Sequence, residues 1–166
     1  MIPLLWNFVL HDYQKNRILA PYDSSIDPTN TGINWQPHQS KIALASGQWT
    51  GAGLGHGTQS QSNALAGKHT DFIFAVVGEE LGLIGACLVI LLLMIIVIRC
   101  VQIGLRSGNT MSMLVCFGVA STVVFQTFEN IGMCIGITPV IGITLPFFSY
   151  GGSSLFTSFA LSLIHI

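Results

Sequence analysis

Two long apolar runs, separated by a short polar connection, dominate the second half of the chain. From Leu81 to Ile98 there is no charged residue, and Arg99 ends the run. A second run extends from Met111 to Phe128. About twenty consecutive apolar residues are enough to cross the hydrocarbon core of a bilayer as a helix. The pattern therefore predicts an all-α fold, a polytopic membrane helix bundle.

The remaining segments are predicted from where these runs stop. Within the first seventy residues, turn-forming residues predominate, and Gln39–Ala45 is the one stretch predicted to form a short interfacial helix. Ile2–Leu10 is too short to span, so we expect Met1 to be an internal residue or a misassigned start. We expect the end of a truncated transmembrane helix at 1–10, an extracytoplasmic loop at 11–70, a transmembrane helix projecting outward at its N-terminus at 71–99, a cytoplasmic loop at 100–110, a transmembrane helix at 111–130, an extracytoplasmic Gly/Pro segment that cannot be a regular helix at 131–152, and the start of a last transmembrane helix at 153–166.

The orientation in the membrane follows from the charges of the short connection. It carries Arg99 and Arg106 and no acid, so the positive-inside rule places it in the cytoplasm. The long polar loop then lies on the other side, and its own basic residues do not change this because long loops cross largely regardless of charge. Four carboxylates gather near one outer rim in this arrangement: Asp71, Glu79, Glu80 and Glu129.

Composition agrees with a membrane protein and excludes other classes. Only 8% of the residues are charged, against about a quarter in soluble domains, and the mean hydropathy is +0.66. A net charge of −1 gives no reason to expect nucleic-acid binding. The cysteines and histidines show no ligand spacing, so we predict no zinc site and treat the four cysteines as small apolar residues.

The junction of the polar loop with the first long run holds the strongest candidate for chemistry. Thr70 is predicted to be the N-cap of the helix, with Asp71 in its first turn. In most proteins such an aspartate is only a favourable partner of the helix dipole. Its predicted place above the bilayer, below a long loop, favours a functional role. We expect Glu79 and Glu80 to be structural residues within reach of headgroup water. Either becomes a functional candidate if its side chain turns inward. For Glu129 a structural and a functional role are given equal weight.

Two further motifs are assigned ordinary roles. The glycine-rich run Gly51–Gly57 is preceded by no strand and followed by no P-loop lysine, so a flexible turn is favoured over a nucleotide site. A contact between its amides and a diphosphate is left open. Ser149–Ser154 resembles no nucleophile elbow, and we interpret it as a turn that caps the last span with Ser153 or Ser154.

Six blocks follow one another along nearly the whole chain: His11–Arg17, Gln39–Ala43, Gly55–Gln61, His69–Gly85, Asn130–Met133 and Thr144–Ser153. Together they resemble the SEDS family (shape, elongation, division and sporulation) of RodA, FtsW and SpoVE. The HDYQ and GTQSQ blocks are more similar to RodA. At one point the chain departs from the family: Ala64–Gly67 replaces the usual Phe-Leu-Pro-Glu before the central motif.

The resemblance implies a multi-pass protein of the bacterial cytoplasmic membrane with roughly ten spans, of which this chain would be the C-terminal part. It implies a peptidoglycan glycosyltransferase that polymerises lipid II, the undecaprenyl-diphosphate-linked disaccharide peptide, at the outer leaflet in elongation or division. It also implies a class B penicillin-binding transpeptidase as partner, besides membrane lipids. The aspartate of the family's TDFIFA motif is its catalytic residue, which is Asp71 here.

Polymerisation of lipid II inverts the anomeric centre, so one carboxylate base and cationic help for the departing diphosphate suffice. No cofactor is required by this scheme, and a divalent cation such as Mg²⁺ is left open. The alternative function is a lipid II flippase, which needs charges along a transverse path, and a third is an inert scaffold for the transpeptidase. We expect this chain alone to be inactive. Candidates for substrate contact are Arg17, Lys41, Gln59, Ser60, Lys68, Glu79, Glu80 and Glu129.

Overall fold

The computed structural model describes residues 11–150 except 24, 63–64, 66 and 68, and its regular elements are all helical over this part. The helix ends predicted at 1–10 and 153–166 lie outside the described residues. An all-α fold is thereby confirmed for the described part. The helices are α2 (Asp12–Leu19), α3 (Trp35–Gly47), α4 (Thr58–Gln61), α5 (Ile73–Arg106) and α6 (Thr110–Ile135).

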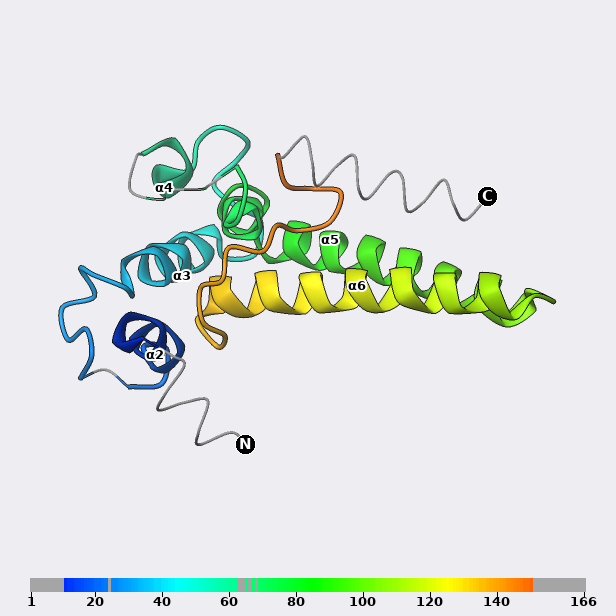
Figure 1. Ribbon diagram of the computed structural model, residues 1–166. Coiled ribbons are helices and arrows are strands. Elements are labelled where there is room, and N and C mark those ends of the chain that lie inside the picture. Colours follow the sequence, from blue (N-terminus) through cyan, green and yellow to red (C-terminus); the bar gives the residue numbers. More distant parts are fainter. Residues whose placement is uncertain (1–10, 24, 63–64, 66, 68, 151–166) are drawn as a thin grey trace.

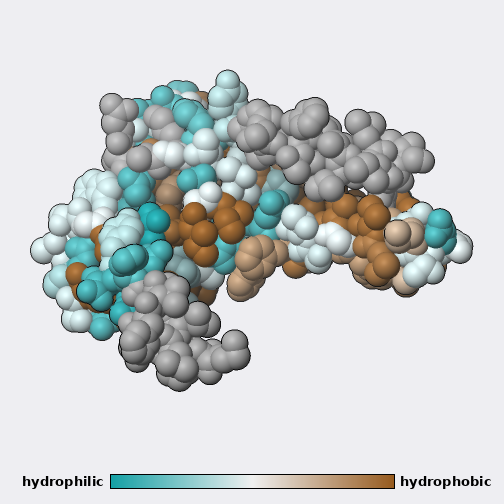
Figure 2. Space-filling view, in the orientation of Figure 1, coloured by the Kyte–Doolittle hydropathy of each residue, from teal (hydrophilic) through white to brown (hydrophobic). Residues whose placement is uncertain are grey.

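Helices α5 and α6 lie side by side and form the long rod of the molecule, while α2, α3 and α4 gather at one end of it (Figure 1). Both are long and apolar enough to cross a membrane. Of their most apolar stretches only 28% and 22% are buried, whereas a core helix of a soluble protein would be mostly buried. The apolar colour concentrates on this rod and the hydrophilic colour on the α2–α4 end (Figure 2). These apolar outer faces are what a lipid environment requires.

Both long helices exceed the lengths expected from the sequence. The connection predicted at 100–110 is helical as far as Arg106, and only residues 107–109 link α5 to α6. The reason is that Gly104, the first glycine after Arg99, stays helical where α5 lies close to Cys116 of α6, so α5 continues to Arg106, just before Ser107 and Gly108. Asn109 then caps α6 by accepting a hydrogen bond from the Met111 amide. Helix α6 also continues to Ile135, so the Gly/Pro segment predicted to be irregular from 131 starts only after the left-handed Gly136.

Helix α5 is broken at Gly82, which the sequence did not indicate. Gly82 has φ 68° and ψ −167°, a backbone conformation that is almost exclusive to glycine. In Figure 1 the part of α5 before the break is viewed along its axis, whereas the rest crosses the picture. The part after the break alone is roughly 35 Å long, at about 1.5 Å per residue, which is enough to cross the hydrocarbon core.

The loop between α3 and α4 supplies the hydrogen bonds that the break removes. On one side of the break, the amides of Ala52 and Gly53 donate to the carbonyls of the two glutamates that precede Leu81, at 2.9 and 3.0 Å. On the other side, the amides of Leu83 and Ile84 donate to the carbonyls of Gln48 and Trp49, at 2.9 and 3.3 Å. Irregular backbone at membrane depth is tolerated where protein satisfies it in this way.

Helix α3 contains the short helix predicted at 39–45 and packs against both long helices. Ala43 is fully buried, and the hydroxyl of Ser40 donates to the carbonyl of Cys134 near the end of α6 at 2.9 Å. The turn that leads into α3 is organised by the buried Asp27, whose carboxylate accepts from the Gly32 and Asn34 amides at 2.9 and 3.0 Å. The bond from the Asn34 amide is the largest of the effects that hold the pKa of Asp27 below its usual value.

Candidate functional site

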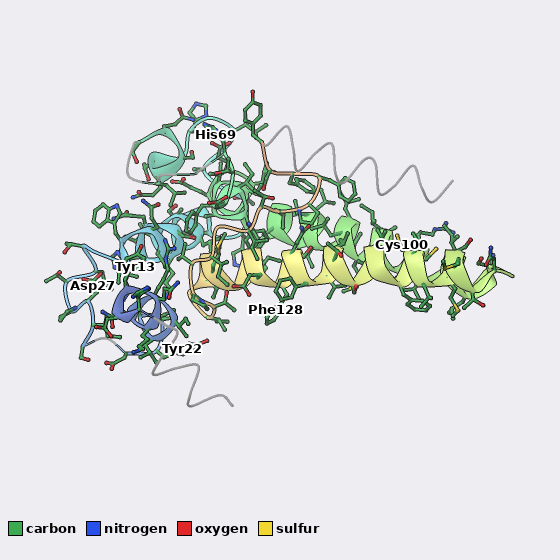
Figure 3. All side chains as sticks on the ribbon, in the orientation of Figure 1. Tyr13, Tyr22, Asp27, His69, Cys100 and Phe128 are labelled. Carbon is green, nitrogen blue, oxygen red and sulfur yellow. The ribbon has the colours of Figure 1, made fainter. Side chains whose placement is uncertain are left out.

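The site is centred on the turn that carries Asp71, just before α5. Three consecutive carbonyls of this turn each accept a hydrogen bond from a distant part of the chain. His69 O accepts from the Tyr150 amide at 2.7 Å, Thr70 O from the Ser149 hydroxyl at 2.7 Å, and Asp71 O from the Asn130 side-chain amide at 2.8 Å. In Figure 3 His69 lies at the same end of the molecule as Tyr22 and Asp27, and Cys100 lies along the rod away from that end. The main chain of this turn is therefore fixed from both α6 and the segment after it.

Two of these three contacts come from buried side chains, and each of these side chains bridges two segments. Asn130 is fully buried in α6 and its amide also donates to Ile143 O at 2.8 Å. Ser149 is 1% exposed, and its hydroxyl oxygen also accepts from the Leu145 amide at 2.7 Å. Together they tie the Asp71 turn, α6 and the segment after α6 into one unit. The sequence had suggested only an ordinary turn for Ser149 and no role for Asn130.

The side chain of Asp71 is half-buried and lies between two glycines. A Cβ placed on Gly142 would come 3.3 Å from its Oδ2, and one on Gly67 would come 3.9 Å from the same oxygen. Among the described residues no hydrogen bond or ion pair engages this carboxylate. A fixed main chain and an unpaired carboxylate are the arrangement that a general base needs, because the acceptor must be positioned and still be available.

The predicted N-cap is wrong. Helix α5 begins at Ile73 with Phe72 as its N-cap residue, and Asp71 precedes the helix instead of lying in its first turn. The reason is a tight turn at the left-handed Gly67, whose carbonyl accepts from the amides of Thr70 and Phe72, both at 3.0 Å. The Thr70 hydroxyl also donates to this carbonyl, at 3.3 Å, so it is not used to cap the helix.

The expectation that Glu79 meets headgroup water is also wrong, because its side chain is 1% exposed and inside the protein. Its carboxylate accepts from the Thr58 hydroxyl at 3.1 Å and from the amides of Gln59 and Ser60 at 2.8 and 2.7 Å. The neighbouring Glu80 is half-buried and accepts from the Ser60 hydroxyl at 2.8 Å. Four residues predicted to contact the substrate are thus hydrogen-bonded among themselves: Gln59, Ser60, Glu79 and Glu80.

The cationic candidates are not gathered around Asp71 in the described part of the chain. Lys41 is exposed and lies against Gly136 at the C-terminal end of α6, where the helix dipole favours a positive charge. It also lines a polar cavity of about 230 Å³ together with Tyr22, Asn34 and His38. Arg17 stacks on Tyr13, 5.6 Å from the ring centre. Lys68 lies outside the described residues.

Glu129, near the C-terminal end of α6, is buried at 6% exposure. Its Oε1 atom has no hydrogen-bond partner within the described residues. Over the same residues, no group of three or more His, Cys, Asp or Glu side chains is placed to hold a metal ion. The absence of a metal therefore stays a prediction.

The turn predicted at Gly51–Gly57 is exposed in its middle, at Leu54 and Gly55, but its two ends pack against α5. Its amides at Ala52 and Gly53 are bonded to α5, which leaves them unavailable for a diphosphate. A Cβ on Gly51 would collide with the backbone of Glu80, and one on Gly57 would come 2.7 Å from the Glu79 carboxyl carbon. Gly51 and Gly57 permit close approach of the backbone to α5. A sequence motif does not distinguish this use of glycine from its use in a phosphate-binding loop.

We predict that Asn130→Leu destabilises the full-length protein and disturbs the site. Leucine keeps the approximate volume but removes both donated hydrogen bonds, and each carbonyl left buried without a donor costs about 1–3 kcal/mol. The measurement is the thermal unfolding midpoint of the purified protein in detergent. Ser121→Ala is the control, because Ser121 is exposed on α6 and bonds only within its own helix. Equal midpoints for the two variants would contradict a stabilising role for the two hydrogen bonds that Asn130 donates.

Comparison with known proteins identifies relatives along the whole chain. The sequence matches the cell cycle protein family of FtsW, RodA and SpoVE over residues 1–165. It is 44% identical over 154 residues to the peptidoglycan glycosyltransferase MrdB of Escherichia coli K12, an alignment that covers 93% of this chain and 41% of MrdB. It is 41% identical over 165 residues to the probable peptidoglycan glycosyltransferase FtsW of Geobacter metallireducens, covering 98% of this chain and 43% of that protein.

A solved structure gives the same result for the fold. A chain from a peptidoglycan synthase complex that coordinates polymerization and crosslinking superposes with a TM-score of 0.70 at 27% identity, over 99% of this chain and 44% of that chain. The chain thus spans less than half the length of the relatives that it matches. The SEDS resemblance predicted from the sequence motifs is confirmed: the chain belongs to the cell cycle protein family of FtsW, RodA and SpoVE.

Proposed function

We propose that the full-length protein is a peptidoglycan glycosyltransferase that polymerises lipid II at the outer face of the bacterial cytoplasmic membrane, with Asp71 as its general base. The observation that carries the proposal is the geometry of the Asp71 turn: three successive carbonyls hold its main chain, while the carboxylate is unpaired among the described residues. The activity of the relatives MrdB and FtsW, both described as peptidoglycan glycosyltransferases, supports it.

In the proposed reaction the 4-hydroxyl of the acceptor sugar attacks the anomeric carbon of the donor. The new glycosidic bond forms as the bond to the lipid diphosphate breaks, and Asp71 takes the hydroxyl proton. Because the linkage changes from α to β, a single displacement suffices and no covalent enzyme intermediate is needed. Positive charge near the departing diphosphate would stabilise the transition state. Lys41, Arg17 and Lys68 stay the candidates for it, with residues of the full-length protein beyond this chain.

A transpeptidase partner is part of the proposal. The structural relative comes from a complex in which polymerization and crosslinking are coordinated, which supports a partner that crosslinks the product strands. We propose a class B penicillin-binding protein in this role. Elongation and division stay equally open for the cell process served.

The test of the function is the formation of glycan strands from purified lipid II by the full-length protein together with its transpeptidase partner. Strands resolved by gel electrophoresis are the expected result. Their absence, with the partner present and the protein folded, would overturn the proposal. The 166-residue chain alone should make no strands, because it contains too few helix faces to enclose a substrate.

The site should face the cell exterior. The motivating observation is that the end of α5 next to its link with α6 carries Arg99 and Arg106 and no acid. Single cysteines at the exposed positions of His56 and Arg106, in a full-length protein freed of its native cysteines, would test this. An impermeant thiol reagent should label position 56 in intact cells and position 106 only after permeabilisation. The reverse pattern would invert the proposed topology.

A further inference from the structure

The segment that carries Asp71 is a closed loop. The chain leaves α4 at Gln61, passes through Asp71 and returns along the first part of α5 to Glu79. There the Glu79 carboxylate accepts the amides of Gln59 and Ser60, so the two ends of the segment are joined directly. The Thr58 hydroxyl adds a third hydrogen bond to the same carboxylate.

The closure is strong because it uses amide donors that a helix cannot satisfy within itself. The first amides of any helix lack partners within the helix, and those of α4 use the Glu79 carboxylate. A four-residue helix has no stability of its own, so α4 depends on this contact. Hydrogen bonds to an ionised carboxylate are about twice as strong as those between neutral groups. Glu79 itself is 1% exposed, so its carboxylate makes these contacts inside the protein.

The closed loop is also packed in its middle. Leu65 is 2% exposed and belongs to the same apolar cluster as Phe72 and Phe74, which flank the start of α5. Glu79 lies eight positions after Asp71, about 12 Å further along the chain if helical rise is applied. Loss of the closure would therefore release both α4 and the Leu65 segment, and with them one side of the turn that holds Asp71.

We propose that Glu79 is a positioning residue for Asp71, and not a ligand of the substrate: its buried carboxylate closes the loop that sets the place of the catalytic turn. This inference rests on the proposed function. Both oxygens of Glu79 are engaged by α4, which leaves neither to meet a sugar or a diphosphate. Its influence on the reaction passes through α4 and the packed Leu65 to the turn that carries Asp71.

The test is Glu79→Gln in the full-length protein with its transpeptidase partner. Glutamine can accept at one oxygen, but its amide nitrogen then faces an amide donor from α4. We expect kcat for strand formation to fall about 10–100-fold, since a displacement of about 1 Å in a catalytic group can cost 10²-fold, while KM for lipid II stays within about twofold. A substrate ligand would instead raise KM. Gln61→Ala, an exposed position on α4, should leave both constants unchanged.

Hydrogen exchange of the same variants separates positioning from a purely local role. In Glu79→Gln we expect faster exchange at the amides of Gln59 and Ser60 and also at residues 69–72. Exchange that increases only within α4, or a normal kcat, would overturn the inference. Thr58→Val removes one donor and leaves the carboxylate in place, so it should give a smaller change in the same direction if Glu79→Gln does not fold. A wild-type protein that makes no strands would refute the proposed function instead, whereas active wild type with fully active Glu79→Gln would refute this inference alone.

Discussion

Replacing Asp71 with asparagine in the full-length protein should lower the rate of lipid II polymerisation by about 10²–10⁴-fold, the usual contribution of a general base. Asparagine keeps the size of the side chain but cannot take a proton from the acceptor hydroxyl. The main chain of the turn should stay in place, because its three hydrogen bonds use carbonyls and not the Asp71 side chain. The measurement is the initial rate of strand formation at matched protein levels, with the transpeptidase partner present.

Two companion variants define the result. Asp71→Glu keeps the carboxylate but moves it by about 1 Å, so only part of the rate should be recovered. Asp23→Asn is the matched control, since Asp23 is an exposed aspartate before α3 that bonds only locally, to the Ser25 amide. Lipid II binding should change little in any of the three. Near-normal polymerisation by Asp71→Asn would show that Asp71 takes no part in the chemistry. If the wild type transported lipid II but formed no strands, the flippase would be favoured instead.

The parts of the fold that the sequence predicted are those set by local pattern. The apolar runs predicted both long helices, and the short helix at 39–45 was found within α3. Asp71 was singled out because it stands between a polar loop and an apolar run. These features depend on neighbours within a few residues, which is the range over which hydropathy and helix propensity act.

The parts that were missed depend on partners far along the chain. Asn130 reaches Asp71 across 59 residues, and Ser149 reaches Thr70 across 79. The expectation that Glu79 meets headgroup water treats the helix before Arg99 as unbroken, whereas α5 is broken at Gly82. A signal was present, since Asn130 is a polar residue next to an apolar run and must find partners when buried. Nothing in the sequence indicated which partners these are.

Gly82→Ala should be among the most damaging single-methyl changes in the chain. The conformation at Gly82 is nearly exclusive to glycine, and adopting it with a side chain costs about 1–3 kcal/mol. The added Cβ would also collide with the backbone nitrogen of Gly51 and come 2.6 Å from the Trp49 carbonyl oxygen. Backbone atoms cannot turn aside as a flexible side chain can. Either the loop at 48–53 detaches from α5, or α5 straightens and carries the Asp71 turn away from α6.

Both outcomes predict a lower unfolding midpoint and a loss of polymerisation of at least about tenfold, because each one displaces the Asp71 turn. The measurements are thermal unfolding in detergent and strand formation by the full-length protein. Gly118→Ala is the matched control: Gly118 lies within α6, a Cβ there would meet nothing within 4 Å, and alanine should stabilise the helix by about 0.5–1 kcal/mol. If Gly82→Ala behaved like Gly118→Ala, the break in α5 would not be needed for the site. A large loss at Gly82 alone would make the bend in α5, held by the loop before α4, the feature that places Asp71 above the membrane span.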